Sequence, residues 1–246
     1  MHILLDLYGV LLDHEKMFRA YRERLAEILC SRFGGDRETW KKAHDEAFVS
    51  YIRGVKEADW DARGWAEIVD SLDERNLMEM FELAGVPTTP ENPLALARHV
   101  EREAMERVDA RFPDARPAIE RLRRAGDKVY VATGGSETAR AALRGAGLVH
   151  LVDGIFTGHT QNALKARPRY WSEIPKSLGV SARQCVLVDD RLDYLEAAAS
   201  VGIVALLLDR KGAHRPEAMP VYVKATLRNL AGLPQWVGTW ESTSAA

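Results

Sequence analysis

Acidic, hydroxyl and basic residues lie in this chain where short apolar runs end. Asp6 directly follows an apolar run, Thr133 ends a β-branched run, and Asp189 and Asp190 follow a third apolar run. Lys165 lies between the last two places along the chain. A carboxylate that attacks an electrophile needs donors to hold the oxygens of the transferred group and a cation to screen charge. These residue types therefore indicate nucleophilic catalysis by Asp6, with Thr133 and neighbouring amides as donors and Lys165 as the cation.

The carboxylates of this set need compensation if they converge. Asp6, Asp189 and Asp190 would raise one another's pKa and partly neutralise themselves unless a cation lay among them. Mg²⁺ prefers hard oxygen ligands, which are often one or two carboxylates completed by water and substrate oxygens. We therefore expect Mg²⁺ as the cofactor, held by Asp6 and Asp190.

The spacing of apolar residues predicts two kinds of organisation in the chain. Strands are expected at residues 2–5, 128–133, 154–157, 185–188, 203–208 and 221–223. Between the first two strands the pattern is helical throughout, with helices expected at 15–33, 37–52, 62–71, 74–84 and 94–108. After residue 109 helices and strands alternate, with helices expected at 115–124, 136–145, 171–178, 192–200 and 226–233.

This alternation predicts an α/β fold, a doubly wound parallel sheet with a Rossmann-like core. The opening strand belongs with the later strands, so the helices between them indicate an inserted all-helical domain. We expect the core at residues 1–14 and 109–240, the helical cap at 15–108 and a disordered tail at 241–246. Ligands of open parallel sheets bind beyond the carboxyl ends of the strands, which is where the reactive residues fall.

Composition excludes several classes of protein. The formal charge of −2 gives no basic surplus for neutralising a phosphate backbone, so we expect no nucleic-acid partner. The longest apolar runs are far shorter than the roughly 18 residues of a membrane span, so we expect no membrane partner. Asp6 interrupts the N-terminal apolar stretch, no basic leader precedes it, and a cytoplasmic location is predicted. Cys30 and Cys185 lack Cys or His at ligand spacing, which favours two reduced, buried thiols.

Four motifs together resemble the haloacid dehalogenase superfamily of hydrolases. They are the segment 6–11 (Asp-Leu-Tyr-Gly-Val-Leu), the segment 131–134 (Val-Ala-Thr-Gly), Lys165 with Pro168, and the segment 186–190 (Val-Leu-Val-Asp-Asp). They occur in the order and at the strand ends typical of that superfamily. The inserted helices resemble its mobile cap, which closes over the substrate.

The resemblance implies a role for each matching position. Asp6 would be the nucleophile and a metal ligand, the backbone carbonyl of Tyr8 a second ligand, and Asp190 a third. Asp189 would support the metal site, although it also suits a structural role at the start of the following helix. Thr133 would bind an oxyanion, and Lys165 would stabilise charge.

The expected substrate is a small anionic molecule, because a cap that closes over a charged site suits a compact ligand. Gly134 and Gly135 are expected to contact it through the turn after Thr133, and Tyr8 is expected either to contact it or to pack beneath the cap. Arg53 in the cap is a candidate for binding an anionic group of the substrate, although a solvated arginine is the default expectation. We expect a monomer or a homodimer.

Tyr8 is the main departure from the pattern of phosphatases in this superfamily, which carry a second Asp at this position. That acid protonates the leaving oxygen and activates water, whereas a phenol with a pKa near 10 is a poor base. The 2-haloacid dehalogenases carry Tyr here but lack the acid pair 189–190, carry Asn in place of Gly134, and have an acid in place of Tyr194. The sequence favours Mg²⁺-dependent phosphate ester hydrolysis, with dehalogenase-like chemistry and a diverged, ligand-binding member as alternatives.

Overall fold

The computed structural model describes residues 1–88, 90–215 and 218–244, and the chain divides into two compact units. The sheet unit comprises residues 1–14, 110–139 and 147–246, and the helical unit comprises residues 15–109 and 140–146. Residues 140–146 were expected in the core but group with the helical unit. There the backbone of Gly145 packs tightly against the carbonyls of Val108 and Met105.

The sheet unit is built on six parallel strands in the order β3-β2-β1-β4-β5-β6. This confirms the predicted doubly wound α/β fold. The central strand β1 pairs in register with both β2 and β4, so its end lies between theirs. The strands are β1 (His2–Leu5), β2 (Lys128–Ala132), β3 (Gly154–Phe156), β4 (Cys185–Asp189), β5 (Val204–Leu208) and β6 (Val223–Leu227).

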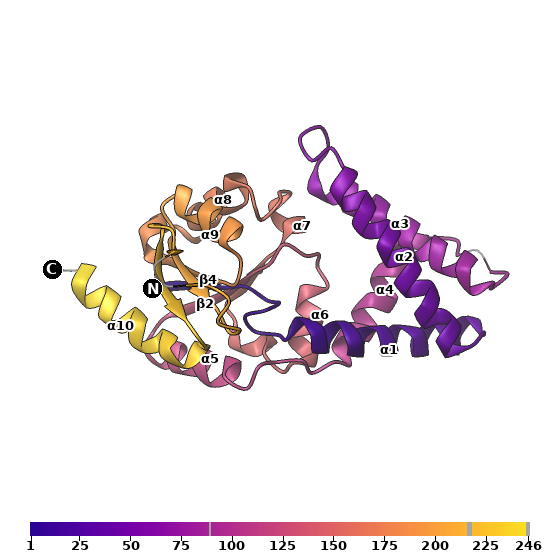
Figure 1. Cartoon of the computed structure of the whole chain (residues 1–246), viewed down its shortest axis with the longest axis horizontal. Helices are drawn as coiled ribbons and strands as arrows, with labels where there is room; N and C mark the ends of the chain where they lie inside the picture. Colours follow the sequence, from indigo (N-terminus) through magenta and orange to yellow (C-terminus); the bar gives the residue numbers. More distant parts are fainter. Residues whose placement is uncertain (89, 216–217, 245–246) are drawn as a thin grey trace. The chain divides into compact units, whose positions relative to one another are not determined.

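Helices cover both faces of this sheet (Figure 1). Alternate residues of the buried strands, such as Leu4, Leu187 and Leu207, pack into one apolar cluster with helices α8 (Pro168–Leu178) and α9 (Leu192–Ser200). On the other face α5 (Ala115–Arg124) packs against β2 and against α10 (Leu233–Ser244). Apolar side chains on both faces explain why β1, β4 and β5 are almost continuously apolar. A short helix, α7 (Gly158–Gln161), follows β3 and was not predicted.

The helical unit buries aromatic and aliphatic side chains between long helices. Trp40 is fully buried, and its ring packs edge-on against Phe81, which also contacts Phe33. The Trp40 indole donates to the Gly34 carbonyl at 2.9 Å and fixes the turn between the first two helices. The helices of this unit are α1 (His14–Phe33), α2 (Arg37–Glu57), α3 (Trp65–Ala84), α4 (Pro93–Glu106) and α6 (Ala139–Gly145), of which α1 and α6 each begin with one residue of the sheet unit.

The largest errors in the predicted element boundaries fall in two places, and the last strand is β6 at 223–227 rather than at the expected 221–223. The expected helices 62–71 and 74–84 form the single helix α3, because the buried residues Leu72 and Leu77 continue one apolar face across the expected break. The expected helix at 226–233 was also wrong, because residues 223–227 alternate in burial and form the edge strand β6 beside β5.

The chain after β6 also differs from expectation. Residues 241–244 extend α10 rather than starting a disordered tail, and residues 245–246 lie outside the described part. Cys185 is buried as expected, whereas Cys30 is only partly buried, and both are free thiols. Among the described residues, no helix combines the length and the apolar character needed to cross a membrane.

Candidate active site

The backbone ladder of the sheet sets the position of three predicted site residues. The Asp6 N–H donates to the Val188 carbonyl at 3.0 Å, so Asp6 lies beside the end of β4 that carries Asp189. The Thr133 N–H donates to the Phe156 carbonyl at 2.9 Å and extends the pairing of β2 with β3. The parallel register therefore brings Asp6, Thr133 and Asp189 to the same edge of the sheet, as the sequence predicted.

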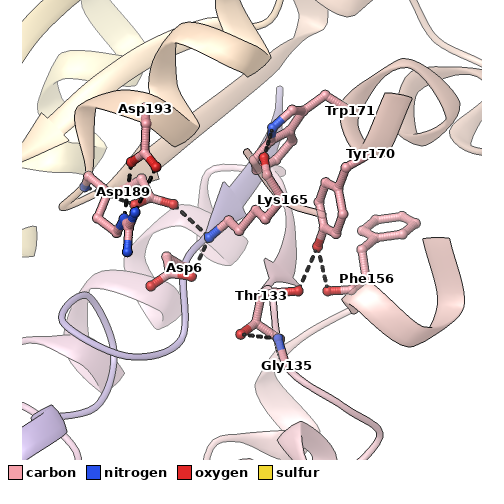
Figure 2. Close-up of polar contacts among 10 residues, drawn as sticks. Asp6, Thr133, Gly135, Phe156, Lys165, Tyr170, Trp171, Asp189 and Asp193 are labelled. Carbon is pink, nitrogen blue, oxygen red and sulfur yellow. Dashed lines mark hydrogen bonds and ion pairs between the residues drawn. The ribbon is translucent and has the colours of Figure 1, made fainter. Parts of the chain in front are cut away.

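Lys165 forms ion pairs with both Asp6 and Asp189 (Figure 2). It comes from the loop between α7 and α8, and its side chain is only 1% exposed. Its ammonium donates to Asp6 Oδ1 and lies 2.6 Å from Asp189 Oδ2. The lysine that the sequence predicted for this site thus forms a buried ion pair with both acids.

Two aromatic residues of α8 hold this loop and the neighbouring strand ends in place. The Trp171 indole donates to the Lys165 carbonyl at 2.8 Å, and the buried Tyr170 hydroxyl lies 2.9 Å from the carbonyls of both Thr133 and Phe156 (Figure 2). Sequence reasoning missed both residues, because aromatic side chains on a helix usually indicate core packing.

Tyr194 covers the Lys165 ammonium. The nitrogen lies 4.8 Å from the centre of the Tyr194 ring, and the Arg191 guanidinium lies 4.3 Å from the same ring. Arg191 also forms a two-point ion pair with Asp193. Cations within about 6 Å of a ring are attracted by its negative face, so Tyr194 supports the charged form of both side chains.

Burial and charge act in opposite directions on the titrating groups of the site. Burial raises the pKa of Asp6 and of Asp189, and the Lys165 ammonium opposes that rise. Burial also disfavours the charged form of Lys165, but Asp189 and Asp6 outweigh it and raise the pKa of the ammonium above its ordinary value. Burial, followed by the negative charge of Asp189, raises the pKa of Asp190. Lys165 therefore stays charged at neutral pH, and added positive charge would favour the ionised acids.

The acid cluster fits a divalent cation. Asp6, Asp189 and Asp190 each offer an oxygen, and these oxygens all lie within 4.8 Å of one another. Asp189 already uses Oδ2 for Lys165 and accepts from the Arg191 N–H at Oδ1, 3.0 Å away. Asp6 and the exposed Asp190 are therefore better placed as ligands than Asp189, and an all-oxygen donor set suits Mg²⁺.

The predicted substrate-contacting residues fall in different parts of the chain. The Gly134 backbone packs against the Lys165 side chain, and the Gly135 N–H lies 3.4 Å from the Thr133 hydroxyl oxygen, so both glycines adjoin the site. Tyr8 is partly buried, with its ring edge-on to His14 at 6.1 Å. Arg53 is exposed on α2, which belongs to the helical unit.

Comparison with known proteins identifies the family to which the chain belongs. A family model described as haloacid dehalogenase-like hydrolase matches residues 1–202. The protein named phosphatase MT3486 of Mycobacterium tuberculosis (strain CDC 1551 / Oshkosh) is 39% identical over 133 residues, which is 49% of this chain and 61% of that protein. An enolase-phosphatase E1 of Pseudomonas fluorescens (strain Pf0-1) is 28% identical over 103 residues, covering 41% of this chain and 45% of that protein. Each match thus spans less than two thirds of the relative.

Solved structures of a phosphatase and of a 2-haloacid dehalogenase share the fold of this chain. A haloacid dehalogenase superfamily phosphatase of Thermococcus onnurineus aligns over 96% of this chain and 97% of its own, with a TM-score of 0.61 and 22% identity. A 2-haloacid dehalogenase of Pseudomonas syringae pv. Tomato DC3000 aligns over 98% and 100%, with a TM-score of 0.67 and 20% identity. At these identities the likeness concerns the fold alone.

Proposed function

The chain belongs to the haloacid dehalogenase-like hydrolase family, and we propose that it hydrolyses a phosphate ester of a small anionic molecule. One observation carries this proposal. The buried Lys165 ammonium lies between Asp6 and Asp189, while Asp190 adds an oxygen within 4.8 Å of those two acids. Such a site suits a doubly charged phosphoryl group better than a neutral carbon centre, because it supplies one fixed cation and ligands for another.

The reaction proceeds in two displacements at phosphorus. An Asp6 oxygen attacks the phosphorus atom, the bond to the leaving oxygen breaks, and an aspartyl-phosphate forms. Water then attacks the same phosphorus, the bond to the Asp6 oxygen breaks, and inorganic phosphate leaves. The leaving oxygen gains the proton that the attacking water gives up, so Asp6 is restored as a carboxylate.

The surrounding residues bind and orient the phosphoryl group. The Thr133 hydroxyl and the N–H groups of Gly134 and Gly135 donate to its oxygens, and Lys165 offsets the charge that builds up as Asp6 attacks. Asp6, Asp190 and the Tyr8 carbonyl would hold Mg²⁺. When bound, that ion neutralises charge on the phosphoryl oxygens.

Tyr8 limits proton transfer in this scheme. It stands where a second carboxylate would protonate the leaving oxygen and activate water, and a phenol does this poorly at neutral pH. We therefore expect the chain to act best on esters whose leaving group is already a weak base, such as aryl phosphates. Loss of general acid and base catalysis typically costs about 10² to 10⁴ in rate.

The second candidate reaction is hydrolytic removal of halide from a 2-haloacid. Tyr8 favours it, because a halide leaves without needing a proton. Lys165 and Asp6 would serve this reaction equally well, with an ester on Asp6 in place of the aspartyl-phosphate. The pair Asp189 and Asp190 argues against it, because a cation site has no part in displacing halide.

The test compares three proteins on two substrates. Phosphate release from p-nitrophenyl phosphate and halide release from 2-chloropropionate are measured with Mg²⁺ or with chelator, for wild type, Asp6→Asn and Tyr8→Asp. We expect wild type to release phosphate only with Mg²⁺, Asp6→Asn to be inactive, and Tyr8→Asp to be faster by about 10²-fold. Halide release that persists in chelator would establish the second reaction instead.

Other outcomes also discriminate among the candidates. Phosphate release from Tyr8→Asp but not from wild type would contradict the proposal for this chain. It would mean that the core can support phosphatase chemistry, while the protein itself carries out another reaction or binds a ligand. Full phosphatase activity in chelator would remove the metal from the scheme.

A further inference from the structure

Arg210 follows strand β5 and reaches back to the loop that carries the nucleophile. Its Nε donates to the Gly9 carbonyl at 3.2 Å, and its Nη2 donates to the Val10 carbonyl at 2.7 Å. The side chain is 18% exposed. A guanidinium 200 residues later in the chain thus holds the two consecutive carbonyls that directly follow Tyr8.

The same guanidinium binds the segment in which the chain re-enters the sheet unit. It forms a two-point ion pair with Asp114 at 3.0 and 3.1 Å, and it lies 3.8 Å from the centre of the Phe112 ring. Asp114 is held in turn by the Leu230 N–H at 2.6 Å. Four groups from two segments therefore converge on Arg210.

These two segments are themselves joined by backbone hydrogen bonds. The Asp13 N–H donates to the Ala110 carbonyl at 2.8 Å, and the Phe112 N–H donates to the Leu11 carbonyl at 2.9 Å. The chain leaves the sheet unit after residue 14 and returns at residue 110. Arg210 thus fixes the place where residues 11–13 and 110–112 run side by side, as well as the loop after Asp6.

Gly9 links Arg210 to the acid cluster. Its φ is +88°, and a Cβ at this position would lie 2.2 Å from Asp190 Oδ2. The Gly9 backbone therefore touches the carboxylate of Asp190 and gives its carbonyl to Arg210. A movement of this backbone would change its contact with Asp190 and would displace the neighbouring Tyr8 carbonyl.

The loop that carries Arg210 is itself anchored. Asp209 is 4% exposed and accepts from the N–H groups of Ala213 and His214 at 2.9 and 3.1 Å. Arg228 donates to both the Asp209 carbonyl and its carboxylate. The guanidinium therefore projects from a rigid turn.

We propose that Arg210 is a positioning residue that holds the loop of residues 7–12 through the carbonyls of Gly9 and Val10. By fixing this loop it sets the affinity of the acid cluster for its cation. The metal part of this inference rests on the proposed function. Arginine is required because its planar fork supplies several N–H donors in fixed directions while its flat face stacks on Phe112. Lysine keeps the charge but has neither the fork nor the flat face.

The test uses the full chain and two readouts. The first is amide hydrogen exchange of residues 7–13 without metal or substrate, and the second is the MgCl₂ concentration that gives half of the maximal rise in melting temperature. The variant is Arg210→Lys, and the matched control is Arg123→Lys. Arg123 likewise binds a carboxylate and a carbonyl, those of Asp153 and Leu151. These two residues lie just before β3, which is an edge strand three positions from β4 and four from β5 in the sheet order β3-β2-β1-β4-β5-β6.

We expect Arg210→Lys to speed exchange in residues 7–13 and to raise the half-saturating MgCl₂ concentration, each by about tenfold, the effect of losing a charge-assisted hydrogen bond. Arg123→Lys should change neither. If Arg210→Lys fails to fold, Asp114→Asn removes one acceptor of the same pair and should give smaller changes in the same directions. Equal exchange in wild type and in the folded Arg210 or Asp114 variant would overturn the proposal.

The two readouts separate this proposal from the proposed function. If wild type neither responds to MgCl₂ nor releases phosphate, the proposed function fails, while the exchange data still decide whether Arg210 holds the loop. If exchange rises but the MgCl₂ response is unchanged, Arg210 holds the loop without setting metal affinity, which overturns the inference as stated.

Discussion

The two units of this protein differ in whether they bury a cluster of charged side chains. The sheet unit buries Lys165 between Asp6 and Asp189, with all three side chains less than 10% exposed. The helical unit keeps ion pairs such as Arg63 with Glu67 on its surface, where both side chains are about half exposed or more. Its main apolar cluster consists largely of aromatic rings and aliphatic side chains.

This difference shows where the chain retains groups for chemistry rather than for stability. Burying charges is costly, and a buried ion pair often stabilises a fold no better than apolar residues of the same volume. The cluster at the strand ends is therefore best explained by the reaction it supports. Surface pairs of the helical unit are typically worth less than about 1 kcal/mol and carry no comparable functional signal.

The largest contrast is expected from removing one cation in each unit. Lys165→Met leaves Asp6 and Asp189 buried without their partner, so we expect a loss of about 3–5 kcal/mol in the free energy of unfolding and loss of phosphate release. Arg63→Met should cost less than about 1 kcal/mol. Urea denaturation of both variants at pH 7 measures the difference.

Similar losses from the two substitutions would contradict this contrast. A stable but inactive Lys165→Met would show that the acids neutralise themselves without the ammonium, so that Lys165 acts in catalysis alone.

A smaller contrast is expected between two glycines with positive φ. Gly9 in the sheet unit has a φ of +88° and touches Asp190, whereas Gly85 in the helical unit has a φ of +65° and would have no atom within 4 Å of an added Cβ. Both substitutions to Ala should cost roughly 1–2 kcal/mol through backbone strain. Only Gly9→Ala should also displace Asp190 and lower the rate of phosphate release by tenfold or more. The affinity for Mg²⁺ should fall by about the same factor.

Steady-state assays at several Mg²⁺ concentrations, together with melting curves, test this pair. Equal activity of the two variants would mean that the contact between Gly9 and Asp190 has no part in the reaction.

The smallest effect concerns Asp73, a partly buried acid of the helical unit. Burial, followed by the charge of Asp70, raises the pKa of Asp73 to about 7, against the hydrogen bond from Tyr51 and the charge of Arg98. Between pH 4 and pH 7 the unfolded chain then binds fewer protons than the folded one, so stability falls as pH rises. Asp73→Asn should remove this slope, a gain of about 1 kcal/mol at pH 8 relative to pH 5 for a partly exposed group.

Melting temperatures of wild type and Asp73→Asn at pH 5 and pH 8 provide the measurement. A difference between the two proteins that does not change with pH would show that Asp73 titrates near its ordinary pKa.

The sequence was informative where chemistry follows strand ends. Asp6, Thr133, Asp189 and Asp190 each end a recognisable apolar run, so parallel pairing alone predicted that they meet. Lys165 has a weaker signal, since a lysine in a loop is usually solvated, and its predicted role rested on the resemblance to the family as well as on its residue type. The structure brings Asp6, Thr133, Lys165 and Asp189 to the carboxyl ends of the strands (Figure 2), and an oxygen of Asp190 lies within 4.8 Å of those of Asp6 and Asp189.

Residues that act through long-range contacts were not predictable in the same way. Arg210 binds carbonyls 200 and 201 residues earlier in the chain, and no local pattern reveals such a pairing. Tyr170 and Trp171 resemble core residues of a helix until the carbonyls that they bind are known. The strand β6 was misread for a related reason, because only pairing with β5 separates its short alternation from the start of a helix.

The most direct test of Asp6 as covalent nucleophile is chemical trapping during turnover. Because Tyr8 is a poor base, the second displacement should be slow and the aspartyl-phosphate should accumulate. Acid quenching followed by borodeuteride reduction converts an acyl phosphate, but not a carboxylate, into an alcohol that peptide mass spectrometry locates. We expect deuterium at residue 6 only with aryl phosphate and Mg²⁺ present. Phosphate release without any label at residue 6 would contradict the covalent role of Asp6.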